Sequence, residues 1–131
     1  MIKCVFMIHR APHLSFAEFA QYWSQQHAKL AIANAPQMRM RRYVQNHRRD
    51  HDVAEGFRAA RDCLMGPFDG IAEAWWDSFE DMAAAAGETP EEVAAAILAD
   101  EGRFVDLRRS VIWFGEEKPF WPIGGTARGE R

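Results

Sequence analysis

A histidine on an apolar helical stripe is the first candidate for chemistry in this sequence. Phe16, Phe19, Trp23, His27 and Leu30 recur at spacings of three and four residues, so all five would point inward from one helix. A histidine in such a place can titrate near neutrality and exchange a proton with a ligand. The residues alone leave a second interpretation open, because a lone inward histidine is often a hydrogen-bonded core residue.

Residues 40–47 supply further polar candidates. Side chains alternate along a strand, so Tyr43, Gln45 and His47 share one face, while Arg42 and Asn46 share the other. If the first face lies beneath the helix, it offers a phenol, an amide and an imidazole to one cavity. We predict that this face lies beneath the helix, that Tyr43 and His47 are catalytic, and that Gln45 binds the substrate. The opposite parity would make Asn46 and Arg42 the relevant groups, and Asn46 is kept as a substrate-binding candidate.

Aromatic side chains could form the walls of the same cavity. Trp23, Trp75, Trp76 and Phe79 offer flat apolar surfaces that suit an aromatic or polyketide ring. Such residues are more often core packing. Because Trp75 and Trp76 are neighbours on a predicted strand, they face opposite sides, and only one of the two substrate-binding candidates can line the cavity.

The sequence offers little support for a metal or an organic cofactor. His9 with His13, and His47 with His51, have the gap of some metal ligands. That gap aligns two side chains only within a helix, whereas both pairs include the end of a strand. The sequence contains no Gly-rich phosphate loop, G-x-S-x-G elbow or dinucleotide fingerprint. We therefore predict no metal and no cofactor.

Length and composition are those of one small domain. The chain has 131 residues, of which 48% are apolar, enough for a single core. Its longest apolar run is well below the roughly 18 residues of a membrane span, and its first residues contain no small-residue cleavage site. We expect a cytoplasmic protein with no membrane partner. Cys4 and Cys63 are then reduced thiols.

Charge is unevenly distributed along the chain. The net charge is −3, which argues against a general affinity for nucleic acid. Arginines gather between residues 39 and 61, and acidic residues dominate residues 62–106. This asymmetry indicates solvated faces or complementary subunit surfaces, in preference to a patch for nucleic acid or an anionic ligand.

Two strand–helix–strand halves would position these side chains. The apolar pattern predicts strands over residues 2–9, 40–47, 69–76 and 109–115. Ser15 and Glu18 form a capping box that begins the first helix, which Pro36 ends. Ser78 caps the second helix. We expect Gly87 to interrupt that helix and residues 89–92 to start it again toward residue 99.

Two segments fall outside these halves. Residues 48–67 are charged and contain Gly and Pro, and we interpret them as a long loop and a candidate lid, although 53–64 could form a short helix. Residues 118–131 lack any period and are predicted to be a tail that packs on a partner subunit. The domain itself would span residues 1–117.

The order of the elements predicts an α+β, ferredoxin-like domain. Two β-α-β units give a four-stranded antiparallel sheet with helices on one face. The other face would expose Val, Ile, Phe and Trp, an apolar patch too large for a monomer. We therefore expect a homodimer in which two open sheet faces meet.

Four segments resemble the EthD-like family of the dimeric α/β-barrel superfamily. Residues 19–27 (FAQYWSQQH) are similar to that family's first-helix pattern, an aromatic pair followed by a histidine one turn later. RYVQNH at 42–47, DGIAEAWWDS at 69–78 and ADEGRFVD at 99–106 resemble further blocks in the same order. The resemblance covers most of residues 1–117, and it implies a dimeric α/β barrel.

The resemblance also favours a role for His27 in chemistry. Family members place a histidine at the matching position, in a pocket between helix and sheet, so the resemblance implies that His27 is catalytic. Tyr22 and Trp23 are further substrate-binding candidates, which the resemblance does not cover. The superfamily includes cofactor-free isomerases, cyclases, dehydratases and decarboxylases. We expect such an enzyme, acting on a cyclic aromatic, phenolic or polyketide-like small molecule. The alternatives are a non-catalytic binding or accessory protein, and an oxygen-dependent monooxygenase or haem-handling relative.

Overall fold

The fold is known from a computed structural model, which describes residues 1–64 and 66–121. Four strands form one antiparallel sheet in the order β2-β3-β1-β4. The strands are β1 (Ile2–Ile8), β2 (Arg42–His47), β3 (Gly70–Trp76) and β4 (Val111–Gly115). The helices are α1 (Phe16–Gln21), η1 (Tyr22–His27), α2 (Ala28–Asn34), α3 (Asp52–Ala60), α4 (Phe79–Glu88) and α5 (Glu91–Phe104).

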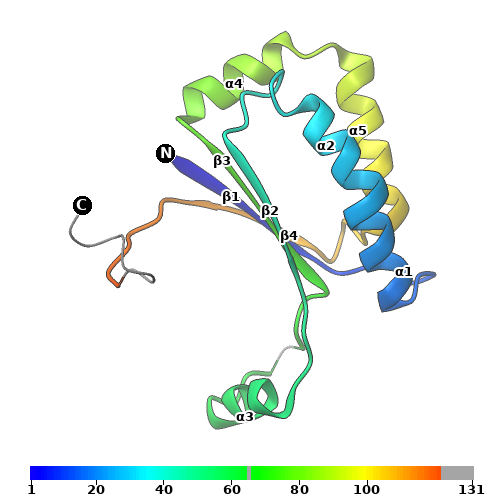
Figure 1. The fold of residues 1–131 in the computed structure, drawn as a ribbon, viewed down its shortest axis with the longest axis vertical. Coiled ribbons are helices and arrows are strands. Elements are labelled where there is room, and N and C mark those ends of the chain that lie inside the picture. Colours follow the sequence, from blue (N-terminus) through cyan, green and yellow to red (C-terminus); the bar gives the residue numbers. More distant parts are fainter. Residues whose placement is uncertain (65, 122–131) are drawn as a thin grey trace.

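All helices except α3 lie over one face of the sheet (Figure 1). This arrangement confirms the predicted α+β, ferredoxin-like fold. No helix among the described residues is long and apolar enough to cross a membrane.

Strand register gives the sheet two chemically different faces. Phe6 of β1 pairs with Ala72 of β3 and with Ile112 of β4, and these side chains point toward the helices. Their neighbours Val5, Glu73 and Trp113 point to the other side, which we call the open face. Val111 and Trp113 are exposed there, so the open face carries part of the apolar set that the sequence predicted. Ile112 and Phe114 of the same strand point to the helix side instead, because side chains alternate.

The first helix is continuous from residue 16 to residue 34, but its middle segment is not α-helical. Ser15 and Glu18 form the predicted capping box at its start. The segment η1 is a π-helix, and it turns Trp23 and His27 into the interior. Single π-helical turns are rare and occur frequently at functional sites. The sequence predicted the helix but not this wider turn.

Trp23 is the contact through which the first helix rests on the sheet. Its indole is 1% exposed and stacks on Phe19 and on His47. A Cβ atom at Gly70 would lie 2.4 Å from the Trp23 ring. The first residue of β3 must therefore lack a side chain for the helix to approach this closely.

Residues 48–67 are not a structureless loop, so that interpretation was wrong in part. They contain α3, whose N-terminus is capped by the His51 side chain, which accepts a hydrogen bond from the backbone of Val53. The helix lies beyond the end of the sheet, away from the other helices (Figure 1). None of its residues lines the cavity beneath the first helix, and this position does not suit a lid.

The second helical region also differs from the prediction. Gly87 stays within α4, and the break comes at Thr89 and Pro90. Thr89 does not cap α5, because its hydroxyl donates back to the carbonyl of Ala85. α5 begins after Pro90 and reaches Phe104, beyond the expected end near residue 99.

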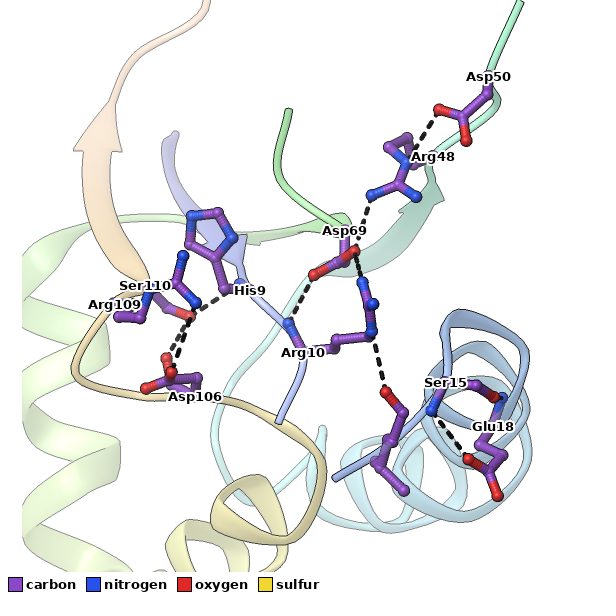
Figure 2. Close-up of polar contacts among 11 residues, drawn as sticks. His9, Arg10, Ser15, Glu18, Arg48, Asp50, Asp69, Asp106, Arg109 and Ser110 are labelled. Atoms are coloured by element: carbon purple, nitrogen blue, oxygen red, sulfur yellow. Dashed lines mark hydrogen bonds and ion pairs between the residues drawn. The ribbon is translucent and has the colours of Figure 1, made fainter. Parts of the chain in front are cut away.

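A buried carboxylate, Asp69, joins the ends of three strands (Figure 2). It accepts hydrogen bonds from the backbone N–H of Arg10 at 2.8 Å and from the guanidinium groups of Arg10 and Arg48, both at 2.7 Å. Burial alone would raise the pKa of Asp69, but these donors outweigh it and lower the pKa. Arg10 also donates to the carbonyl of Leu14, which ties the cluster to the start of α1.

Replacing Gly70 by Ala should destabilise the fold, because the new methyl group would overlap the Trp23 indole. Overpacking of this kind costs about 1–3 kcal/mol. Denaturant unfolding of Gly70→Ala and of the wild type measures this loss of unfolding free energy. Gly87→Ala is the matched control, because nothing lies within 4 Å of the added Cβ and alanine favours the helix. Equal stabilities of the two variants would contradict the close contact.

Replacing Asp69 by Asn should lower the free energy of unfolding by about 2 kcal/mol near neutral pH, because hydrogen bonds to a charged group are lost. The folded state lowers the pKa of Asp69 below the usual 3.8. The contribution is therefore fully present above pH 3.8 and is lost as the pH falls through the folded-state pKa. The difference in unfolding free energy between wild type and Asp69→Asn should narrow only below that pH. A difference that is the same across the acid range would refute the ion cluster.

Candidate functional site

A cavity of about 150 Å³ lies between the helices and the helix-facing side of the sheet. Its walls are mostly apolar, and its polar side chains are few. The lining residues are Cys4, Phe6, Ile8, Trp23, His27, Ala31, Met38, Met40, Tyr43, Ala72, Ala74, Trp76, Ile97, Glu101 and Phe104. The polar members that can exchange protons are therefore a histidine, a tyrosine, a glutamate and a cysteine.

His27 lines the cavity from η1, and one of its ring nitrogens already makes a hydrogen bond within the protein. It is 7% exposed, and its Nδ1 donates a hydrogen bond to Oδ2 of Asp100 at 2.8 Å. Its ring packs on Phe104, with the centroids 4.9 Å apart. Within the described residues Nε2 has no hydrogen-bond partner, so it is the nitrogen that a bound ligand would meet.

Asp100 is buried in α5 and gathers three donors. Its Oδ1 accepts hydrogen bonds from the Tyr22 hydroxyl at 2.5 Å and from Arg103 at 2.9 Å, in addition to the bond from His27. Burial would raise the pKa of Asp100, but these hydrogen bonds prevail and lower the pKa. Asp100 is therefore ionised at neutral pH. It fixes the ring of His27 and can stabilise the imidazolium form, as a carboxylate does for a catalytic histidine.

Glu101 and Tyr43 face the cavity as weak acids. Burial raises the pKa of Glu101, although the nearby His27 opposes the shift. Burial also raises the pKa of Tyr43, although its hydroxyl accepts a hydrogen bond from Gln45 at 3.0 Å. Raised pKa values favour the neutral forms, which can donate a proton or a hydrogen bond. The cavity therefore combines a histidine with two groups suited to an oxygen atom of a ligand.

Gln45 and His47 lie on the helix-facing side of β2 with Tyr43, but neither lines the cavity. Gln45 donates to the carbonyl of Trp23, and His47 stacks on the Trp23 ring at 4.6 Å. Trp23 therefore stands between His47 and the cavity. The structure does not bring His47 together with His27. Gln45 holds Tyr43 and the backbone of Trp23 in place through its hydrogen bonds.

Three predicted substrate contacts lie elsewhere. Asn46 and Trp75 point to the open face, because their strand positions have the opposite parity to Tyr43 and Trp76. Asn46 donates to Glu73 there, and Trp75 donates to Glu117. Tyr22 is outside the cavity lining, since its hydroxyl is bound to Asp100. Among the predicted residues, His27, Tyr43, Trp23 and Trp76 meet at the cavity.

Asp100 and Glu101 were missed as site residues by the sequence reasoning. A signal for Glu101 was present, because Ile97, Glu101 and Phe104 have helical spacing, and an acid on an apolar stripe is unusual. No comparable signal marked Asp100, whose partners come from η1. No group of three or more metal-ligating side chains occurs among residues 1–64 and 66–121.

The arrangement suits proton transfer. Nε2 of His27 is open to a ligand, and a carboxylate holds the opposite side of its ring. Burial raises the pKa values of Tyr43 and Glu101, and in their protonated forms both can donate a hydrogen bond to an oxygen atom of a ligand. Trp23 and Trp76 are buried and exclude water from the walls.

Known structures share this fold at low sequence identity. An EthD family protein from Bacillus halodurans C-125 aligns with a TM-score of 0.60 and 17% identity, over 90% of this chain and 99% of its own. A dimeric protein of unknown function with a ferredoxin-like fold, from Bacteroides fragilis, has a TM-score of 0.57 and 9% identity, over 88% and 95%. SnoaB from Streptomyces nogalater, a cofactor-independent oxygenase, has a TM-score of 0.54 and 19% identity, over 92% and 96%.

Sequence comparison gives one family and no curated relative. The search of curated proteins found no significant match. The EthD domain model matches residues 11–108, a range that contains His27, Tyr43, Asp100 and Glu101. The chain therefore belongs to the EthD family.

Proposed function

We propose that this protein is a cofactor-independent enzyme that moves a proton next to a carbonyl group of a small molecule. The substrate is a cyclic aromatic, phenolic or polyketide-like compound, and the reaction is an isomerisation, cyclisation, dehydration or decarboxylation. The main support is the His27–Asp100 pair, which leaves Nε2 of His27 open to an apolar cavity. A histidine held in this way can act first as a general base and then as a general acid.

In this mechanism Nε2 of His27 takes a proton from the carbon next to the carbonyl group. Asp100 stabilises the resulting imidazolium, because its carboxylate already accepts the Nδ1 proton. Tyr43 and Glu101 donate hydrogen bonds to the substrate oxygen as negative charge develops on it. The same imidazolium then returns the proton to another atom of the substrate, which determines the product.

Replacing His27 by Asn should lower turnover by roughly 100-fold or more, the usual contribution of a general acid–base group. The asparagine amide can still donate to Asp100, so the carboxylate keeps its partner. A suitable measurement is deuterium exchange at the α-carbon of acetophenone or 1-tetralone in D₂O, followed by mass spectrometry. These probes test proton abstraction without assuming the natural product.

His13→Asn is the matched control, because His13 is exposed and does not line the cavity. It should exchange deuterium like the wild type. Thermal unfolding of both variants tests whether the fold is intact. Full exchange activity in a folded His27→Asn variant would exclude His27 as the general base.

A second candidate is oxygenation without a cofactor. SnoaB is described as a cofactor-independent oxygenase, and deprotonation of a phenol or an enol by His27 would also prepare such a substrate for reaction with O₂. Oxygen consumption with phenolic substrates separates the two candidates. Ligand binding without exchange or oxygen uptake would instead favour an accessory binding protein.

We also propose that the protein is a homodimer that joins two open faces. Val111 and Trp113 are exposed on this face, and the similar protein from Bacteroides fragilis is described as dimeric. Contiguous apolar surface of this kind is normally covered by a partner. Phe120 and Trp121 are also exposed, which supports packing of the tail on the partner subunit. Residues 122–131 of the predicted tail lie outside the described residues.

Replacing Trp113 by Lys should convert the dimer into a monomer, because a charge would be buried where two open faces meet. Ile112→Lys is the matched control, since Ile112 is the next residue of β4, is also exposed, and points to the helix side. Light scattering after size-exclusion chromatography measures the mass. A monomeric wild type, or dimers for both variants, would contradict this interface.

A further inference from the structure

A second cavity of about 230 Å³ lies beside the His27 cavity, between α4 and α5. Its lining residues are Met38, Trp76, Met82, Ala85, Ala86, Thr89, Ala94 and Ile97. Met38, Trp76 and Ile97 also line the His27 cavity. These three side chains are therefore the shared wall of two adjacent chambers. Met38 is unbranched and adaptable, so part of this wall can change its shape.

The second chamber has no free polar group for a ligand among its lining residues. Thr89 supplies its only side-chain oxygen, and that hydroxyl donates to the carbonyl of Ala85 at 2.7 Å. Trp76 turns its indole N–H toward the carbonyl of Met38 at 2.8 Å. By contrast, the side chains that can exchange a proton all belong to the first chamber. The first chamber thus suits the reactive end of a ligand, and the second suits a hydrocarbon end.

A turn with an unusual backbone conformation adjoins Met38, which lines the second chamber. Arg39 has a φ of 60°, a conformation that few non-glycine residues adopt. Its guanidinium group bonds to Glu88 at the end of α4, at 2.9 Å. Its neighbour Met38 lines both cavities. The turn therefore ties the segment that contains Met38 to α4, which forms the opposite wall.

We propose that the second chamber binds an apolar tail of the substrate, such as an unbranched alkyl chain, whose carbonyl-bearing end lies beside His27. This inference rests on the proposed function, since it extends the same substrate past the shared wall. The occupant follows from the adjacency of the two chambers: a group that fills the second one and contacts Met38, Trp76 and Ile97 touches residues that also line the His27 cavity. The substrate class is thus a ketone or polyketide with a hydrocarbon tail.

The test uses acetophenone, butyrophenone, hexanophenone and octanophenone as probes, with affinity measured by isothermal titration calorimetry. For the wild type, affinity should rise by about fourfold for each added methylene until the chamber is full. Ala86→Leu places a larger side chain in the chamber from α4. It should weaken octanophenone binding by about tenfold or more and leave acetophenone within about twofold.

Ala83→Leu is the matched control, because Ala83 is an exposed residue of α4 outside both cavities. It should bind every ketone like the wild type. Affinity that does not change with tail length, equal losses for both ketones in Ala86→Leu, or equal losses in the two leucine variants would overturn the proposal. A change of oligomeric mass in Ala86→Leu would also overturn it, since the chamber would then be an interface between copies.

The proposed chemistry can fail separately. If wild-type protein binds long ketones more tightly but exchanges no α-proton, the tail chamber stands and the proton-transfer function falls. If exchange depends on His27 but tail length has no effect, the function stands and the tail chamber falls.

Discussion

The contact between Trp23 and Gly70 is the constraint on which the site depends. The indole occupies the space that a side chain at residue 70 would fill, so the first helix can approach β3 only at a glycine. Trp23 and His27 are the two buried residues of the π-helical segment η1. The contact that seats the helix therefore also sets the height of His27 above the sheet. In this fold, the packing of one aromatic ring and the position of the candidate base cannot be varied independently.

Asp100 joins this packing to the electrostatics of the site. A buried carboxylate is costly unless donors surround it, and here the donors are Tyr22 and His27 from η1 and Arg103 from its own helix. The same bonds that make the charge tolerable also connect the first helix to α5 and orient the imidazole. The hydrogen bonds that stabilise the charge of Asp100 thus also fix the orientation of the His27 ring. Among residues 1–64 and 66–121 the neighbouring Glu101 has no such set of donors, and burial raises its pKa. Two adjacent acids of one helix therefore have pKa values shifted in opposite directions, an arrangement that favours acid–base chemistry.

Local rules predicted the frame of the molecule well. Capping by Ser15 and Ser78 and the apolar strand pattern place the helices and strands within a few residues of their observed bounds. Alternation along β2 also places Tyr43, Gln45 and His47 on one common face, but it leaves open which face lies toward the helices, and the observed register decides that. Alternation does not show how far along a strand a cavity extends. His47 was therefore predicted to be part of the site, whereas the Trp23 ring lies between His47 and the cavity. The π-helical turn of η1 and the pairing of His27 with Asp100 depend on tertiary contacts between distant residues, and no local pattern encodes them. The helix α3 was underestimated because its cap is a histidine, which is not among the preferred capping residues.

The two faces of the sheet perform different tasks because side chains alternate. The helix-facing side carries small residues at Gly70, Ala72 and Ala74 of β3, which leave room for Trp23 and for the cavity. The open face carries larger residues at the intervening positions, with Lys3 and Glu73 paired at 2.6 Å and Asn46 bonded to Glu73. Mutual pairing neutralises these polar groups, so a partner subunit could cover them without burying an isolated charge. One strand, β3, thus provides space for a ligand on one side and a surface suited to a second subunit on the other.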